Sequence, residues 1–275
     1  MKNFCKLLTL AACLSLSPNA HSATAILGAS KDNTLFQSAV DSSGGGAAGI
    51  FAGATGTGSP RRALIAFDVA GSLPSGATIT SVQFTLHLAL TGGGSSQSFA
   101  LHRLTADWGE GTAGDSLPTV MNSGQGFPAA AGDATWNARF YSSTPWTSPG
   151  ATGDFAATAS ASALVAAVIE TPYSWLSTPA MVSDVQSWLS NPATNFGWAL
   201  VAADEATRGT ARAFYSREAT LDASGDLLDL GFRPALTIEY SVVPEPRTAI
   251  LLAGLSLVLV VAGGRVSRGR GRLNL

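Results

Sequence analysis

One stretch of this sequence alternates between polar and apolar side chains over its whole length, residues 81–90. Its apolar positions are Val82, Phe84, Leu86, Leu88 and Leu90. Successive side chains of a β-strand point to opposite faces of the sheet, so a period of two places these five on one face. An α-helix repeats every 3.6 residues and cannot bury the same set on one side. The stretch therefore predicts a strand with one face in a core.

Several other segments also predict strands. Residues 62–68 place Ala63, Ile65 and Phe67 on one face, and the apolar residues 195–202 are typical of a strand that is buried on both faces. The remaining strand candidates are residues 98–104, 211–217 and 234–240, the last with Leu236, Ile238 and Tyr240 facing inward. The Gly- and Ser-rich residues 42–59 and 142–160 predict long loops or weak strands.

A single helix is expected among these strands. Thr178 is a suitable N-cap, and Pro179 suits the first helical position. The apolar side chains Met181, Val185, Trp188 and Leu189 follow at helical spacing before Asn191 and Pro192 end the segment. The sequence therefore predicts an all-β fold, a β-sandwich with one short amphipathic helix.

The first 25 residues predict a secretory signal peptide. Lys2 and Lys6 precede an apolar run, Pro18 breaks it, and small residues suited to cleavage follow, with the cut after Ser22 or after Ala25. A competing hypothesis takes residues 10–13 as a lipobox, in which Cys13 would be lipidated. The apolar run continues past Cys13, which favours ordinary cleavage.

Composition excludes several function classes for the rest of the chain. Cys5 and Cys13 are the only cysteines, so an exported form has neither a disulfide nor a cysteine-based zinc site or nucleophile. Residues 26–243 carry nine Lys and Arg against 17 Asp and Glu, a net charge of −8. Phosphate backbones are bound by clustered Lys and Arg, so we expect no nucleic-acid partner.

The carboxyl-terminal residues 242–275 contain an apolar run between two polar motifs. Residues 248–264 carry no charge, and as a helix they span roughly 25 Å, close to the ~30 Å hydrocarbon core of a bilayer. The motif before the run is Val243, Pro244, Glu245 and Pro246, and the basic end after it contains Arg265, Arg268, Arg270 and Arg272. The arginines predict a cytoplasmic end, so a single transmembrane helix would keep the acidic domain outside.

This order of Pro-Glu-Pro, apolar span and terminal arginines resembles the PEP-CTERM sorting signal. The resemblance implies an exosortase-type membrane protease as partner, with a membrane-inserted precursor whose tail is removed. It also implies export through the inner membrane of a Gram-negative bacterium, to a cell surface or an extracellular matrix that contains exopolysaccharide. The alternative is a plain C-terminal membrane anchor, which explains the apolar run and the arginines but not the two prolines.

A second resemblance covers residues 26–241. Its motifs occur in order at residues 32–35, 62–68, 73–79, 101–104, 107–111, 133–136, 216–218 and 233–240. The series is similar to the DNRLRE-type domain of bacterial secreted proteins, a carbohydrate-binding-module-like domain. It implies a jelly-roll β-sandwich in an extracellular setting, and the family has no shared catalytic residues to carry over.

The most polar turn contains Asp107, Trp108 and Glu110, and it is the candidate loop for a glycan or for calcium. Calcium takes six to eight oxygen ligands, often from carboxylates and carbonyls of such turns. The alternative is that the two carboxylates bind loop amides while Trp108 fills the end of the core. A structural calcium ion is the one cofactor left open.

Aromatic and titratable side chains elsewhere give weaker signals. Trp108, Trp136, Trp146 and Trp175 are candidates for stacking on a sugar ring, whereas Trp188 and Trp198 are predicted in the core. His87 and His102 lack a nucleophile elbow and a metal-ligand spacing, so no catalytic residue is predicted. Neighbours on a strand face opposite ways, so Arg217 and Glu218 are not expected to pair.

Three functions follow from these patterns. The first is a non-catalytic, exported protein of an extracellular matrix, associated with exopolysaccharide. The second is a carbohydrate-binding module that recognises the matrix polysaccharide, and the third is a glycan-active enzyme.

Overall fold

The computed structural model describes residues 21–114, 119–120, 124–222 and 224–243. Residues 22–241 form one compact unit, and the other unit comprises residues 1–21 and 242–275. Residues 1–20 of the predicted signal peptide, and the predicted transmembrane helix and basic end, lie outside the described residues, whereas residues 21–25 of that peptide belong to a strand. Within the ranges that are described, no helix combines the length and the apolar character needed to cross a membrane.

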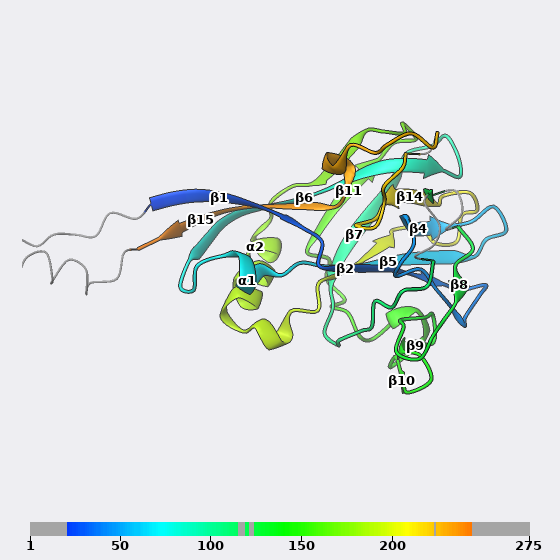
Figure 1. The fold of residues 1–275 in the computed structure, drawn as a ribbon, viewed down its shortest axis with the longest axis horizontal. Coiled ribbons are helices and arrows are strands. Elements are labelled where there is room, and N and C mark those ends of the chain that lie inside the picture. The colour runs from blue at the N-terminus through cyan, green and yellow to red at the C-terminus, as the bar shows by residue number, and fades with distance from the viewer. Residues whose placement is uncertain (1–20, 115–118, 121–123, 223, 244–275) are drawn as a thin grey trace, which may run out of the picture. The chain divides into compact units, whose positions relative to one another are not determined.

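The described residues contain fifteen strands and two α-helices (Figure 1). The strands are β1 (His21–Gly28), β2 (Lys31–Phe36), β3 (Ser42–Ser43), β4 (Gly49–Ala54), β5 (Pro60–Ala66), β6 (Thr78–Thr91), β7 (Gln97–Arg103), β8 (Phe127–Pro128), β9 (Ala138–Phe140), β10 (Thr144–Pro145), β11 (Ala161–Val165), β12 (Pro172–Trp175), β13 (Trp198–Ala202), β14 (Arg212–Tyr215) and β15 (Ala235–Val242). The helices are α1 (Val69–Ser72) and α2 (Pro179–Ser190), with short 3₁₀ turns η2 (Pro149–Ala151), η3 (Pro192–Thr194) and η4 (Leu230–Phe232).

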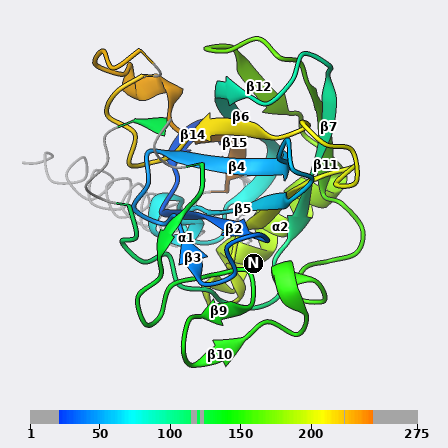
Figure 2. The same cartoon turned by 90° about the vertical axis from the view of Figure 1, so that its right-hand side faces the viewer.

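Eleven strands form one curled antiparallel sheet. Its order is β1-β15-β6-β14-β4-β5-β13-β7-β11, with β12 also paired to β6 and β2 to β5. Strands β4 and β5 pair over a short length, through Gly53↔Arg61 and Ala54↔Pro60. The sheet therefore folds over at this hairpin, and Figure 2 shows β4, β14 and β6 on one side of it and β5 and β2 on the other. The predicted all-β class is confirmed, in a sandwich-like form.

The alternating segment lies in β6 and fills the main core as predicted, except at its end. Val82, Phe84, Leu86 and Leu88 are fully buried among residues from both layers. Between β6 and β14 the register shifts after Ala213, so Leu90 packs outside the main core in a separate small cluster. The prediction for Leu90 is wrong because a bulge changes the face on which the next side chain lies.

Strand β13 is buried on both faces, which confirms the expectation for this segment. Trp198 and Leu200 belong to the main core, whereas Ala199 and Val201 belong to a second cluster on the opposite face of the layer. That second cluster also contains Trp108, from the long loop region that follows β7. The loop with the candidate site is therefore held to the sheet by an apolar layer.

Helix α2 matches the predicted helix in position and in its buried face. The Thr178 hydroxyl accepts a hydrogen bond from the Met181 amide at 3.1 Å, and Pro179 is the first helical residue. Asp184 is the one buried charge of α2, where it accepts hydrogen bonds from Ser160 Oγ (2.6 Å) and Trp198 Nε1 (2.9 Å). The one-turn helix α1 was not expected from the sequence.

Strand β4 lies in the segment that was predicted as a loop or weak strand. All six of its residues are buried, and Ile50 and Ala52 belong to the main core. Glycine and alanine give little apolar periodicity, so the sequence did not indicate how central this strand is.

Candidate functional site

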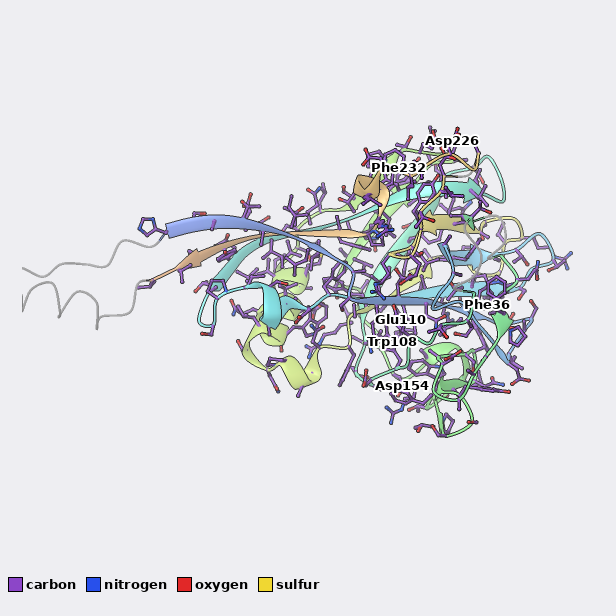
Figure 3. All side chains as sticks on the ribbon, in the orientation of Figure 1. Phe36, Trp108, Glu110, Asp154, Asp226 and Phe232 are labelled. Carbon is purple, nitrogen blue, oxygen red and sulfur yellow. The ribbon has the colours of Figure 1, made fainter. Side chains whose placement is uncertain are left out.

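The candidate loop follows β7 and approaches the start of β2 (Figure 3). Trp108 is 1% exposed, and its indole N–H donates a hydrogen bond to the Phe196 carbonyl at 2.9 Å. Lys31 Nζ lies 4.3 Å from the centroid of the Trp108 ring. Trp108 therefore presents no ring face on which a sugar could stack.

The two carboxylates of this loop bind different partners. Lys31 Nζ donates to Asp107 Oδ1 at 2.8 Å, and the Asp107 side chain remains half exposed. Glu110 Oε1 instead accepts hydrogen bonds from the Asp32 amide and from Arg217 Nη1, each at 2.9 Å. Among the described residues, no group of three His, Cys, Asp or Glu side chains is arranged to hold a metal ion. A calcium ion at Asp107 and Glu110 stays a prediction.

Glu110 belongs to a charged cluster that the sequence did not reveal, made up of Asp32, Glu110, Arg217 and Glu218. Asp32 is the second residue of β2, Glu110 lies in the loop after β7, and the other two follow β14. The Arg217 guanidinium also binds Glu218 Oε1 at 2.9 Å. Residues more than a hundred positions apart thus meet at one end of the sheet.

The prediction that Arg217 and Glu218 cannot pair is wrong. Strand β14 ends at Tyr215, and the Glu218 amide donates a hydrogen bond to Ser216 Oγ at 3.1 Å. The two residues therefore lie in a turn, where successive side chains no longer point to opposite faces.

Asp32 is the most buried carboxyl group of the cluster. It is 0% exposed, Oδ2 accepts a hydrogen bond from the Arg217 amide at 2.9 Å, and Oδ1 has no partner among the described residues. Burial raises the pKa of Asp32 well above its usual range, and the charge of Glu218 raises it further. Burial destabilises a carboxylate, so the surroundings of Asp32 favour its protonated form.

The pKa of Glu218, in the same cluster, is also raised. Burial raises the pKa of its carboxyl group from 4.5 to about 7, although the positive charge of Arg217 acts in the opposite direction. Its Oε2 atom also has no partner in the described part of the chain. The cluster can therefore take up or release a proton near neutral pH. Asp32 is inaccessible, so it cannot act directly on a substrate in this structure.

The remaining candidates lie apart from this cluster. All six tryptophans are buried, with Trp136 at 7% and Trp146 at 4% the most exposed, so the prediction of a solvent-facing tryptophan for sugar stacking is wrong. His87 stacks on Phe232 with ring centroids 4.5 Å apart, and burial lowers its pKa. His102 Nδ1 lies 2.8 Å from the Ala156 carbonyl oxygen.

Of the predicted sorting motif only Val243 is described, and it is 56% exposed just after β15. Pro244, Glu245, Pro246 and the four terminal arginines lie outside the described residues.

No family model matches this chain, and no curated protein matches it either. The similarity to DNRLRE-type domains and to PEP-CTERM signals therefore rests on the sequence motifs alone.

Proposed function

We propose that this chain is an exported, non-catalytic protein of an extracellular matrix that is associated with exopolysaccharide and delivered by an exosortase-type sorting system. The observation that carries the proposal is the order of Val243-Pro244-Glu245-Pro246, an uncharged span and an arginine-rich end. Two prolines keep the motif extended and remove two amide donors, which makes it a segment that a protease can read. The four arginines of the basic end fit a cytoplasmic location of that end, with residues 26–243 on the exported side.

The arrangement of the terminal strands supports a role as a domain processed at both ends. Strands β1 and β15 are neighbours in the sheet, so the chain enters and leaves the described domain through adjacent strands. The proposed sorting tail would follow β15 directly, and cleavage after Ser22 or Ala25 would cut within β1. We further propose that the fold of this domain is a jelly-roll β-sandwich of the carbohydrate-binding-module type.

The sorting step is tested by replacing Pro244, Glu245 and Pro246 together with alanine in the full chain. The variant would be expressed in a Gram-negative bacterium that has an exosortase, with one epitope inserted after Ala25, beyond the predicted signal cleavage, and one at the C-terminal end. We expect the wild type to lose the C-terminal epitope and reach the matrix, and the triple variant to keep it and stay in the membrane fraction. Immunoblots of the two epitopes measure both results.

A Ser256→Ala variant is the matched control, because it alters the apolar span without changing the motif or its charge. It should be processed like the wild type. Unchanged tail removal in the triple alanine variant would restore the plain membrane anchor and remove the sorting proposal.

A further inference from the structure

A pocket of about 300 Å³ lies between the β9–β10 hairpin and the turn that joins β2 to β3. The hairpin is at the lower end of the domain in Figures 1 and 2. Ligand sites in proteins measure about 300–1,000 Å³, so this pocket has room for a small ligand or for one unit of a polymer. Seven of its nine lining residues are polar and it is open to solvent, so it suits a polar ligand that can continue beyond it.

Four polar side chains of this pocket are free to bind a ligand. Asp41, Asn137 and Ser142 are exposed, and Tyr141 is half-buried. None of these four side chains forms a hydrogen bond or an ion pair within the part of the chain that the structure describes. Their carboxylate, amide, hydroxyl and phenol groups can therefore bind a ligand without breaking a contact of the fold.

The backbone at Ser142 is in an unusual conformation. The Ser143 amide donates to the Phe140 carbonyl at 3.1 Å, which closes a turn with Tyr141 and Ser142 at its centre. Ser142 has a φ of 63°, in the left-handed region that favours glycine. Other residues in this region cost free energy and occur most often at binding and active sites. A serine at this position costs stability but adds a hydroxyl to the pocket.

The two walls of the pocket are fixed by contacts behind them. Trp146 is 4% exposed, its indole N–H donates to the Thr135 carbonyl at 2.9 Å, and its amide donates to the Asn137 carbonyl at 3.2 Å. On the other wall, the Asp41 carbonyl accepts a hydrogen bond from the Ala129 amide at 3.0 Å. A site that is already ordered loses less entropy when a ligand binds.

The chemistry of these side chains suits a neutral ligand that is rich in hydroxyls. A carboxylate only accepts hydrogen bonds, whereas an amide, a phenol and a hydroxyl each donate and accept. The described lining residues include no Lys, Arg or His, and Asp41 would repel an anion. A cation would use the acceptors and leave the donors without partners. Sugar hydroxyls both donate and accept, so they match the whole set, and the Tyr141 ring can pack against sugar carbons.

From the unpartnered polar side chains of this pocket, we propose a binding site for a neutral sugar unit of a polysaccharide. Asp41 accepts hydrogen bonds from adjacent sugar hydroxyls, Asn137 and Ser142 bind further hydroxyls, and Tyr141 packs against the ring carbons. The inference rests on the proposed association with exopolysaccharide, and it names the class of sugar and the place where it binds. A tyrosine thus supplies the aromatic contact for which the buried tryptophans are unsuited.

Asp41→Ala tests the site, because the side chain is exposed and supports no other part of the described fold. Asp226→Ala is the matched control. Asp226 is also exposed, its side chain has no partner within the described ranges, and Figure 3 places it at the upper end of the domain, away from the hairpin. Each variant loses one negative charge, and both should unfold at the urea concentration of the wild type.

Ser142→Gly is a second test that separates binding from folding. It relaxes the left-handed backbone and removes the hydroxyl. We expect it to unfold at no lower urea concentration than the wild type and still to bind the sugar more weakly. A purely structural role for Ser142 would leave binding unchanged, and that result would remove this residue from the site and contradict the proposal as stated.

Binding would be measured by calorimetry on the full chain, at physiological salt and in a detergent without a sugar headgroup. The neutral probes are β-1,4-linked hexamers of glucose, mannose, galactose and xylose, and the charged probes are hexamers of galacturonic acid and of glucosamine. We expect at least one neutral hexamer to bind and the charged hexamers not to bind. Asp41→Ala should weaken the neutral hexamer by about tenfold or more, as the loss of a hydrogen bond to a charged group does, and Asp226→Ala should bind like the wild type.

Equal affinities of Asp41→Ala and Asp226→Ala would overturn the site. Binding of a charged hexamer in place of the neutral ones, or no binding of any hexamer, would overturn it as well. The proposed function fails separately. Failed tail removal with intact hexamer binding refutes only the sorting proposal, whereas normal tail removal without hexamer binding refutes only this site.

Discussion

At the scale of single residues, Asp32 and Glu218 set the pH response of the domain. A carboxyl group whose pKa is higher in the folded state binds more protons there than in the unfolded chain. Stability therefore falls as pH rises from the ordinary pKa of 4.5 to the folded value of about 7 for Glu218, and is constant above it. The buried Asp32 acts in the same direction. These two carboxyl groups therefore contribute more stability at pH 5 than at pH 8, whereas His87, whose pKa is lowered by burial, contributes in the opposite direction.

Replacing Glu218 with glutamine should remove part of this pH dependence. Glutamine imitates the protonated acid. At pH 8 we expect the free energy of unfolding of Glu218→Gln to exceed that of the wild type by roughly 1–2 kcal/mol, a range that allows for solvent screening. At pH 5 we expect the two proteins to be equally stable. Urea unfolding at both pH values measures the difference. Glu239→Gln changes an exposed glutamate of β15 and is the control, with no change expected at either pH. A variant less stable than wild type at pH 8 would show that pairing with Arg217 outweighs burial.

At the scale of secondary-structure elements, the N-cap of α2 has two roles. The Thr178 hydroxyl accepts from the Met181 amide and donates to the Ser160 carbonyl at 2.5 Å, so it ties the helix to the segment before β11. We expect Thr178→Ala to lower the free energy of unfolding by about 1–2 kcal/mol, as the loss of such a cap does elsewhere. Thr178→Ser keeps the hydroxyl and should cost far less. Equal losses in both variants, measured by urea unfolding, would assign the effect to the threonine methyl group instead.

The elements also show where sequence reasoning succeeds. The alternation in β6, the two apolar faces of β13 and the cap and stripe of α2 were predictable, because each depends on local periodicity. Strand β4 was missed because its glycines and alanines carry little pattern, and the position of Leu90 depended on a bulge that only pairing with β14 creates. Local patterns therefore identified elements, but not the contacts between strands distant in sequence.

The same limit applies to the candidate sites. Asp32, Glu110 and Glu218 were each visible in motifs, yet their meeting depends on the packing of β2 and β14 with the loop after β7. Trp136 and Trp146 were misjudged because the loops that carry them pack against β2, β5 and β13 and form a second core there.

At the scale of the whole molecule, all six tryptophans report on one folded domain. Each is less than 10% exposed, so we expect blue-shifted emission with little quenching by acrylamide, and a red shift on unfolding in urea. Trp136→Phe and Trp146→Phe should leave the emission maximum nearly unchanged, because even these two rings, the most exposed of the six, are buried. Strong acrylamide quenching of the native protein would contradict the burial of the loop tryptophans.

The position of β15 has a mechanical consequence for a protein held in a polymer network. Seven residue pairs join β15 to β6, from Ala235↔Thr85 to Ser241↔Thr78, and β1 lies along its other side. Ladder hydrogen bonds run perpendicular to antiparallel strands. A force that pulls the chain beyond Val242 along the axis of β15 shears these bonds simultaneously instead of opening them one at a time. The strand nearest the proposed sorting tail is thus also the one placed to resist extraction under tension.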